Sequence, residues 1–515
     1  MKKTIFPAHE LRPVGYTALI QRLGLKIIPN WHQSYITGGS FLKMDTVGGV
    51  TEAFYPAKYL PGDTLGDHLE FALKYDGTNL ALLVAVFQSI SKQELENYIV
   101  SKPQGKYARR LWFLYELLTG TILDIDDLRT GNYLDALDPN EYYTILKPKR
   151  VSRQRINNNL LGNHLFCPII RRTDILKQYE NVNFQERCCA IVADYPPQLL
   201  KRAIAYLYTK ETRSSFEIER LEPNTTRTER FVSLLQSAKR EDYCNKSRLL
   251  ELQNHIVDPR FQDKNYRHTQ NYVGESAFLQ REKIHYISPK PDDLPKLMEG
   301  LIDSHHWMEQ HGVHAVIHAA IVSYGFVFLH PFEDGNGRIH RFLIHNILAR
   351  RGVTPSDMIF PVSAFMLRNL NDYDASLEAF SRPLMEHIEY SLNDEGQVEV
   401  QNETTHLYKY VDLTTQTEFL FRCIDQTIET ELVDELIFLA NYDNTKKTIQ
   451  KIIDMPDRKI DLFIRVCVQN NGRLSKAKRE KLFDYLSDEE IAQLEEAICF
   501  AYFPPPSHGA VESKK

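Results

Sequence analysis

Residues 330–341 read His-Pro-Phe-Glu-Asp-Gly-Asn-Gly-Arg-Ile-His-Arg and form the most informative segment of this 515-residue chain. The preceding residues, 313–329, are apolar at helical spacing, and Pro331 disfavours helix at His330, so a buried helix should end there. A second apolar-periodic stretch starts near Ile339 and is closed by Gly352. The sequence therefore predicts two helices joined by a short loop, with Gly-Asn-Gly at the start of the second helix.

The groups in this loop suit the binding of a polyphosphate. A helix N-terminus exposes unpaired N–H groups and a partial positive charge, and Gly335 and Gly337 let the backbone approach an anion closely. Arg338 and Arg341 are three residues apart, so both can project from the first turn of the helix. Together with Asn336, these groups predict a site for the phosphates of a nucleotide.

Two further residues suit chemistry at such a phosphate. Asp334 offers a hard oxygen ligand for Mg²⁺, which proteins usually hold through one or two carboxylates and the substrate phosphates. His330 is the residue of the loop best suited to proton transfer near neutral pH, and it can take the proton of an attacking hydroxyl. We expect Phe332 to anchor the loop against the core. Because the loop contains no Ser, Thr, Cys or Lys, direct transfer is the simpler mechanism.

The string resembles the signature of Fic-domain proteins at every defining position, and the resemblance covers about residues 205–385. Most enzymes of that family use ATP and Mg²⁺ to transfer AMP to a Ser, Thr or Tyr hydroxyl of a target protein, a reaction called AMPylation. The resemblance implies that His330 is the general base and that Asp334 holds Mg²⁺. It further implies that residues 335–337 cradle phosphates and that Arg338 and Arg341 bind the β/γ end. The implied partner is a protein substrate that carries a hydroxyl, with self-modification as an option.

Residues 214–220, Ser-Ser-Phe-Glu-Ile-Glu-Arg, resemble the Ser/Thr-x-x-x-Glu-Gly/Asn motif of autoinhibited Fic proteins with an N-terminal inhibitory helix. Ser215 and Glu219 stand at the required spacing. A glutamate paired with Arg341 would withhold that guanidinium from the γ-phosphate and repel the phosphate by its own charge. Arg220 departs from the Gly or Asn of the motif, so we expect a weaker or differently arranged inhibitory contact. The alternative is a glutamate on an exposed, charged helix.

The segment 281–291 alternates polar and apolar residues with period two and ends at Pro289 and Pro291, as is typical of a strand. It resembles the β-hairpin flap with which Fic proteins clamp the target peptide by strand pairing. The resemblance implies that Ile284, His285 and Tyr286 form the target-docking part of the flap. A surface hairpin without this role would show the same pattern.

Composition and charge exclude several classes of protein. The chain has 62 Lys and Arg against 68 Asp and Glu, a net charge of −6, which argues against wholesale nucleic-acid coating. A local basic face remains open, for example at residues 472–482, although a solvated amphipathic face is the preferred interpretation. No apolar run reaches the ~18–20 residues that span a bilayer, and no secretory signal is expected. We interpret the seven cysteines as reduced thiols of a cytoplasmic protein.

We expect a mostly α-helical protein in which helical domains flank a central Fic-type domain. The expected boundaries are an N-terminal domain of unknown role (1–195), an inhibitory-helix region (196–245), a Fic domain with flap and signature loop (246–390), a linker (391–406), a helical C-terminal domain (407–503) and a tail (504–515). Within the N-terminal domain, residues 107–118 should form a helix, with Arg109 and Arg110 on a solvated shoulder. Ser487 and Glu490 have the spacing of a capping box.

Rival functions remain at this point. Within the family, the domain could transfer UMP, phosphocholine or phosphate, or remove AMP with Glu219 orienting water. The intact Gly-Asn-Gly favours nucleotide transfer. From another class, the chain could be a DNA-binding or adaptor protein whose Fic domain is latent. The target protein and the oligomeric state, for which a homo-oligomer is one option, do not follow from the sequence.

Overall fold

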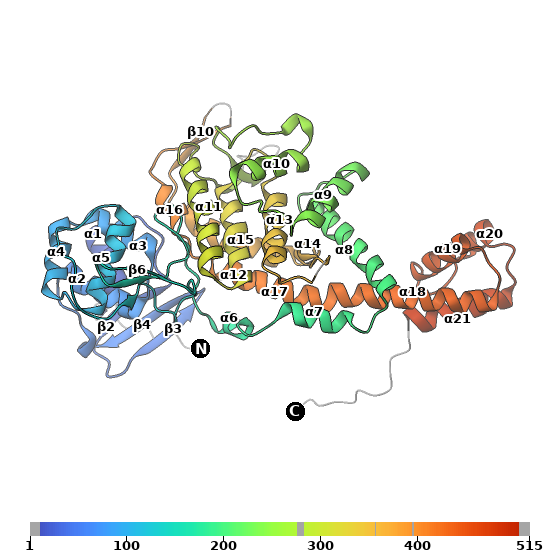
Figure 1. Ribbon diagram of the computed structural model, residues 1–515, viewed down its shortest axis with the longest axis horizontal. Coiled ribbons are helices and arrows are strands. Elements are labelled where there is room, and N and C mark those ends of the chain that lie inside the picture. The colour runs from blue at the N-terminus through green and yellow to red at the C-terminus, as the bar shows by residue number, and fades with distance from the viewer. Residues whose placement is uncertain (1–10, 276–282, 356, 394–395, 504–515) are drawn as a thin grey trace. The chain divides into compact units, whose positions relative to one another are not determined.

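The computed structural model describes residues 11–275, 283–355, 357–393 and 396–503 (Figure 1). Over these residues the chain is mostly helical with small sheets, which confirms the predicted fold class. It forms two compact units, the first made of the residues up to 183 with 212–353 and 366–423, and the second of residues 184–211, 354–365 and 424 onward. None of the described helices combines the length and the apolar character that crossing a bilayer requires.

The N-terminal part of the first unit combines helices with two sheets. The larger sheet has the strand order β1-β2-β4-β3, and its parallel pair joins β2 to β4. The smaller sheet has the order β5-β7-β6. The strands are β1 (Arg12–Val14), β2 (His32–Thr37), β3 (Lys43–Val47), β4 (Val50–Pro56), β5 (Leu134–Asp135), β6 (Lys149–Val151) and β7 (Ile156–Asn158). The sequence did not predict these sheets, because most of the strands are too short to show period-two alternation.

The helices of this part surround an apolar core. They are α1 (Gly15–Leu23), α2 (Leu65–Phe71), α3 (Leu80–Ser89), α4 (Lys92–Ser101) and α5 (Lys106–Thr119). The indole of Trp112 on α5 is fully buried among the leucines of α3 and α5. The core explains why the apolar stretches of this region fold as helices, since each buries one face against its neighbours.

The expected solvated shoulder on α5 is wrong. Arg109 and Arg110 are only 3% and 5% exposed. Arg109 Nε donates to the carbonyl oxygen of Gln154 at 2.9 Å, and Arg110 Nε donates to that of Asp135 at 2.8 Å. The two guanidiniums therefore satisfy main-chain acceptors at the smaller sheet, a role that periodicity along one helix does not reveal.

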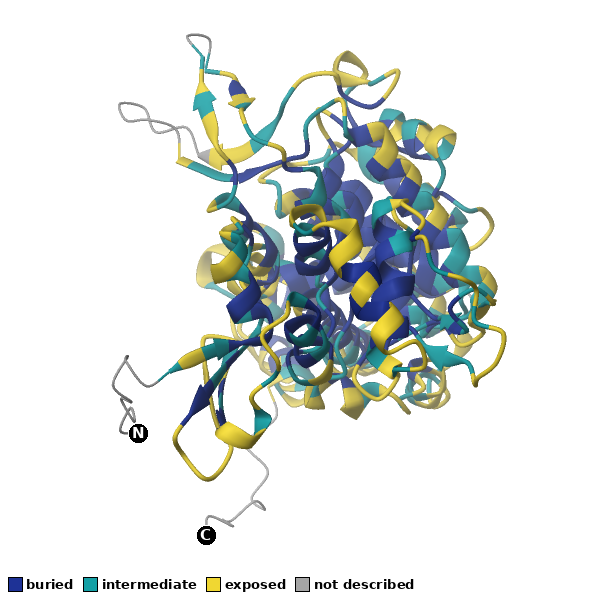
Figure 2. Cartoon of the chain, turned by 90° about the vertical axis from the view of Figure 1, so that its left-hand side faces the viewer, coloured by how far each residue is buried: buried dark blue, intermediate teal, exposed yellow. Residues whose placement is uncertain are grey.

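The central part of the first unit is a helical bundle with two hairpins. Its helices are α10 (Lys246–Ile256), α11 (Leu294–His311), α12 (Ala315–Leu329), α13 (Asn336–Arg350) and α15 (Leu370–Met385), which Figure 1 shows packed together. The hairpins are β8 (Tyr272–Glu275) with β9 (Lys283–Ile287), and β10 (Tyr390–Leu392) with β11 (Val398–Val400). Nearly every residue of α12 is buried. In Figure 2, whose view faces the N-terminal part, buried residues likewise lie toward the middle and exposed residues lie at the rim. A helix that is apolar all round requires such a central position.

The remaining elements lie in either unit or run from one into the other. Short or connecting helices are α6 (Asp174–Tyr179), α7 (Phe184–Val192), α8 (Pro197–Glu217), α9 (Thr225–Ser237), α14 (Val362–Arg368), α16 (Thr405–Lys409) and α17 (Thr414–Gln426). The second unit contains α18 (Val433–Ile452), α19 (Asp457–Val468), α20 (Lys476–Leu482) and α21 (Asp488–Tyr502). The capping box predicted at Ser487 and Glu490 is confirmed at the start of α21.

Candidate functional site

The signature loop (residues 330–335) begins where α12 ends. His330 takes a left-handed conformation with φ 50°, and its N–H donates to the carbonyl of Phe326 at 3.0 Å. Its imidazole Nδ1 lies 3.1 Å from the carbonyl oxygen of Val327. Because a carbonyl can only accept, Nδ1 carries the proton and Nε2 keeps a free lone pair. The helix end predicted from Pro331 is thus confirmed, and it orients the imidazole.

The protonation state of His330 suits a base. Burial lowers its pKa to about 4; the Val327 carbonyl and Asp334 raise the pKa, and the positive charge of Arg267 lowers it further. The imidazole is therefore neutral near pH 7, where Nε2 can accept a proton. The structure thus supplies both the orientation and the charge state that a general base needs.

Two residues hold the loop in shape. The ring of Phe332 is fully buried against Tyr266 and Phe326, as expected for an anchor. The side-chain amide of Asn336 accepts from the N–H of Phe332 at 3.1 Å and donates to its carbonyl at 2.7 Å. The structure thus uses the Asn336 side chain, which we assigned to nucleotide binding, to close the loop.

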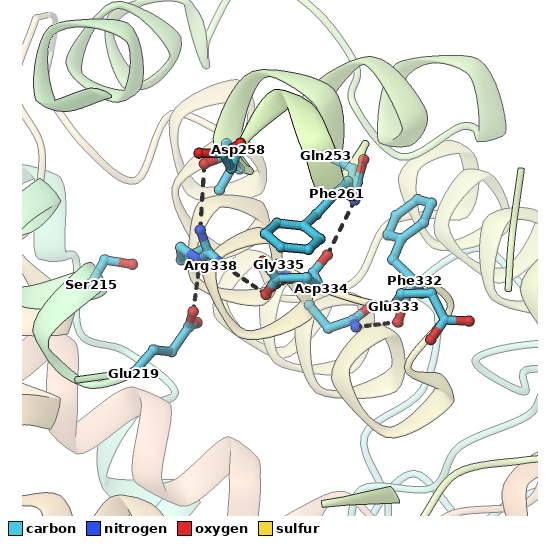
Figure 3. A network of polar contacts seen from close by, with 12 residues as sticks. Ser215, Glu219, Gln253, Asp258, Phe261, Phe332, Glu333, Asp334, Gly335 and Arg338 are labelled. Atoms are coloured by element: carbon cyan, nitrogen blue, oxygen red, sulfur yellow. Dashed lines mark hydrogen bonds and ion pairs between the residues drawn. The ribbon is translucent and has the colours of Figure 1, made fainter. Parts of the chain in front are cut away.

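Asp334 lies near the end of the signature loop, two residues before the start of α13. Its Oδ1 accepts the N–H of Gly335 at 2.6 Å and Nη2 of Arg338 at 2.8 Å, and its side chain is 49% exposed (Figure 3). Gly335 is the N-cap of α13 with φ 91°, a backbone conformation that favours glycine. A Cβ at Gly337 would lie 2.5 Å from Oε1 of Glu219, so only glycine fits there in this state.

Glu219 binds both arginines of the signature. Its Oε2 accepts Nε of Arg338 at 2.6 Å, and its Oε1 accepts Nη2 of Arg341 at 2.8 Å (Figure 3 shows the first pair). Arg341 also donates to Oγ and to the carbonyl of Ser215, at 2.9 and 2.5 Å. Both guanidiniums are almost completely buried. Burial disfavours the charged form of Arg341, but the Glu219 carboxylate and Tyr373 together outweigh this effect and raise the pKa of Arg341. We call these four residues the arginine clamp.

The backbone conformation of Arg220, the residue after Glu219, explains why the motif usually has Gly or Asn at this position. Arg220 has φ 58° and follows the end of α8, where the N–H of Leu221 donates to the carbonyl of Phe216 at 3.1 Å. This is a left-handed helix termination, which Gly and Asn adopt most readily. The expected weakening of the contact by Arg220 does not appear in the geometry, since Glu219 reaches both arginines.

The predicted flap is a hairpin of β8 and β9, with a register shift between Val273 and Gly274. Ile284 and His285 are partly exposed, whereas Tyr286 is 7% exposed and donates its hydroxyl to the carbonyl of Phe328. Only the main chain of Tyr286 is thus left for docking a partner. Residues 281 and 282 of the predicted strand lie outside the described residues.

The sequence missed residues that support the loop from outside. Gln253 Nε2 donates to the carbonyl of Asp334 at 3.4 Å and to Oδ2 of Asp263 at 3.1 Å. The same Asp263 oxygen accepts the N–H of Glu333 at 3.2 Å (Figure 3 draws Gln253 and the loop). The signal available in the sequence was a glutamine at a position on the apolar face of α10, and in the fold this glutamine is fully buried. Arg267 and Asp263 stand in an irregular segment that offered none.

Comparison with known proteins identifies the domain. The model of the Fic/DOC family matches residues 243–348, which include α10, the flap, α11, α12 and all but the end of α13. This chain contains a Fic/DOC family domain. The Fic domain holds the signature loop and both arginines, while Ser215 and Glu219 lie before the matched residues.

The curated relatives match about a fifth of this chain. A protein adenylyltransferase Fic of Drosophila grimshawi is 35% identical over 113 residues, 21% of this chain and 20% of its own. Its counterpart in Nematostella vectensis is 36% identical over 93 residues, 18% of this chain and 19% of its own. The chain thus spans about a fifth of the length of these relatives. The Fic domain is distantly related to protein adenylyltransferases.

Two solved structures share the family name. A Fic family protein from Desulfovibrio desulfuricans G20 has a TM-score of 0.36 at 18% identity, with 61% of this chain and 85% of that chain covered. A Fic domain containing signaling protein from Bacteroides thetaiotaomicron VPI-5482 has a TM-score of 0.35 at 19% identity, covering 51% of this chain and 97% of that chain. At these scores, nothing about the site follows from them.

Proposed function

We propose that this chain transfers AMP from ATP to a Ser, Thr or Tyr hydroxyl of a protein, and that Glu219 restrains the reaction. One observation carries the proposal: a single short loop joins a neutral, oriented imidazole to a helix N-terminus that bears two buried guanidiniums. An imidazole base and cationic anchors about one loop apart are what phosphoryl chemistry at a triphosphate requires. The distant relatives named adenylyltransferase support the same choice.

The proposed step is direct transfer. The hydroxyl oxygen of the target forms a bond to the α-phosphorus of ATP, while the bond from this phosphorus to the α,β-bridging oxygen breaks and pyrophosphate leaves. The hydroxyl proton passes to Nε2 of His330. Arg338 and Arg341, once free of Glu219, bind the β- and γ-phosphates and stabilise the charge that builds up on pyrophosphate. The free N–H groups at the start of α13 bind phosphate oxygens.

The residues of the loop fit a bound Mg²⁺. The Asp334 carboxylate is half exposed, and its hydrogen bonds with Gly335 and Arg338 use Oδ1. Hard oxygen ligands of this kind, shared with substrate phosphates, are typical of Mg²⁺ sites. Mg²⁺ would supply neutralisation of phosphate charge, and Asp334 is the residue that would hold it.

Glu219 binds Arg338 and Arg341, the two arginines that we propose as phosphate anchors. A carboxylate that binds two buried guanidiniums competes directly with the β- and γ-phosphates for the same donors. Its negative charge would also repel the triphosphate at short range. We therefore propose that the described arrangement is the restrained form of the enzyme.

Labelled ATP tests the proposal. The full chain is incubated with Mg²⁺ and α-³²P-labelled ATP in lysate of its own cells, and protein-bound label is counted. Glu219→Gly should raise labelling at least about tenfold, because freeing two buried guanidiniums for phosphate amounts to ~1.4 kcal/mol or more. Glu217→Gly, at an exposed position of the same helix end, is the matched control and should match the wild type.

The general base is tested in the Glu219→Gly variant, in which Glu219 no longer holds the two arginines; we call this variant the released background. His330→Ala combined with Glu219→Gly should lower labelling by about 10²- to 10⁴-fold and leave ATP binding near that of Glu219→Gly. Undiminished labelling would refute the base assignment. Labelling of the purified chain alone would reveal self-modification. Absence of label in both protein and lysate, for the wild type and Glu219→Gly alike, would refute the proposed function.

A further inference from the structure

Arg267 lies between the flap and the signature loop. Its side chain is 3% exposed, and its hydrogen bonds run to main-chain carbonyls. Nε donates to His330 at 2.8 Å, Nη1 to Thr269 at 2.7 Å and Nη2 to Pro289 at 2.6 Å. Its backbone N–H donates to the carbonyl of Pro331 at 2.9 Å. Arg267 therefore donates hydrogen bonds both to the signature loop and to the segment that follows the flap.

This guanidinium is buried, and the part of the chain that the structure describes gives it no counterion. Among the described residues, no carboxylate lies within ion-pair distance of Arg267, and burial lowers its pKa to about 10. A buried charge that is not paired destabilises a fold unless hydrogen bonds satisfy it. Lysine has the same charge, but it cannot present a planar fork of donors to separated acceptors. The free-energy cost of burying this charge therefore indicates that the planar set of donors on the guanidinium has a role of its own.

We infer that Arg267 is a positioning residue that sets the distance between the flap and His330. Pro289 follows β9 by two residues, and His330 carries the base. Because one rigid group bonds the carbonyls of both, their separation is fixed by the width of the guanidinium. This inference rests on the proposed function: a target strand paired with the flap would present its hydroxyl at a set distance from Nε2 of His330.

A second link at the flap base supports the assignment. Asn271 Nδ2 donates to the carbonyl of Phe332 at 3.3 Å, and the N–H of Ser288 donates to the carbonyl of Asn271 at 3.3 Å. The carbonyls of residues 330, 331 and 332 are therefore all bonded from the segment 267–271. The hydrogen bonds of Arg267 run to residues 269, 289, 330 and 331 and not to the arginine clamp, so nucleotide binding should not depend on it.

Kinetics in the released background test the inference. Arg267→Gln and Arg267→Lys are each combined with Glu219→Gly, and Arg240→Gln, at an exposed position, serves as the matched control. Both Arg267 variants should lower kcat at least about tenfold, because a small displacement of reacting groups slows transfer strongly. The KM for ATP should stay within about twofold of the Glu219→Gly parent, and Arg240→Gln should match that parent.

Hydrogen exchange of the full chain gives a measurement that needs no activity. Arg267→Gln should speed amide exchange in peptides covering 283–293 and 330–335 and leave 336–350 unchanged. Unchanged kcat, or unchanged exchange at 283–293, would overturn the inference. So would a loss shared equally by kcat, ATP binding and exchange throughout the domain, since that describes a general structural role. If the Glu219→Gly parent transfers nothing, the proposed function fails, and the exchange result alone decides the link.

Discussion

Single buried groups in this chain have charge states that the sequence does not reveal. Asp76 is 1% exposed; its Oδ2 accepts the N–H of Tyr16 at 2.9 Å, and its Oδ1 accepts the hydroxyl of Ser34 at 2.5 Å. Burial raises its pKa to about 8, against the lowering effect of these hydrogen bonds. The carboxyl is therefore protonated in the folded chain over a range in which the unfolded chain has it ionised.

This difference predicts a pH dependence of stability. A raised pKa means that the folded state binds more protons, so the contribution of Asp76 is complete below about pH 3.9 and is lost as pH rises through about 8. The free energy of unfolding of the wild type should fall more from pH 6 to pH 9 than that of Asp76→Asn. Urea titrations at both pH values measure it. Equal slopes for the two proteins would show that Asp76 is ionised when folded.

Arg220 gives a second prediction at this scale. Its left-handed backbone disfavours any residue with a Cβ, so Arg220→Gly should stabilise the first unit by about 1 kcal/mol. Arg220→Ala keeps the Cβ and is the matched control, which should bring no such gain. Chemical unfolding measures both. A gain for alanine as large as that for glycine would place the effect in the lost arginine side chain.

At the scale of elements, local signals predicted structure well where one helix meets one loop. Pro331, the two glycines and the apolar periods on either side predicted the end of α12 and the start of α13. The sequence could not predict that Asn336 closes the loop or that Gln253 supports it, because those bonds depend on the fold. It also missed the strands of the N-terminal sheets, of which four have only two or three residues. The prediction for Arg109 and Arg110 was wrong because the carbonyl groups that accept their hydrogen bonds lie far away in the sequence.

The capping box of α21 can be tested on its own. Ser487 Oγ accepts the N–H of Glu490 at 3.1 Å, and the Glu490 carboxylate accepts the N–H of Ser487 at 2.8 Å. Ser487→Ala should lower the free energy of unfolding of the second unit by about 1 kcal/mol. Glu489→Ala, exposed in the same turn but outside the box, should have a smaller effect. Equal effects would mean that helix charge matters here more than the cap.

At the scale of the whole molecule, the two units differ in how local their cores are. The core of α18 to α21 is drawn only from residues of that segment, among them Ile449, Phe463, Phe483 and Leu494. The main apolar core of the first unit instead combines residues between 16 and 169 with Tyr410, which lies some 240 residues further along the chain. The boundaries that we predicted from composition remain predictions, because compactness alone does not define them.

This difference predicts independent folding of the C-terminal helices. An excised segment 433–503 should be helical by circular dichroism and should melt cooperatively, because it keeps its whole apolar core. Phe463→Ala, which removes a fully buried ring, should lower its stability by about 3–5 kcal/mol or abolish folding. An excised segment without cooperative melting would show that the remaining chain is needed.

The missing side chain at Gly337 has one more consequence. The carboxylate of Glu219 fills the volume that a Cβ would take, directly over the first turn of α13. Under the proposed function, the Glu219 carboxylate and the phosphates of ATP would exclude each other from this volume, so only molecules in which the carboxylate has left it would bind ATP. The apparent dissociation constant of ATP would then equal the intrinsic one divided by the fraction of molecules in which the carboxylate has moved away, so the population of one carboxylate rotamer would set the nucleotide concentration at which the protein responds.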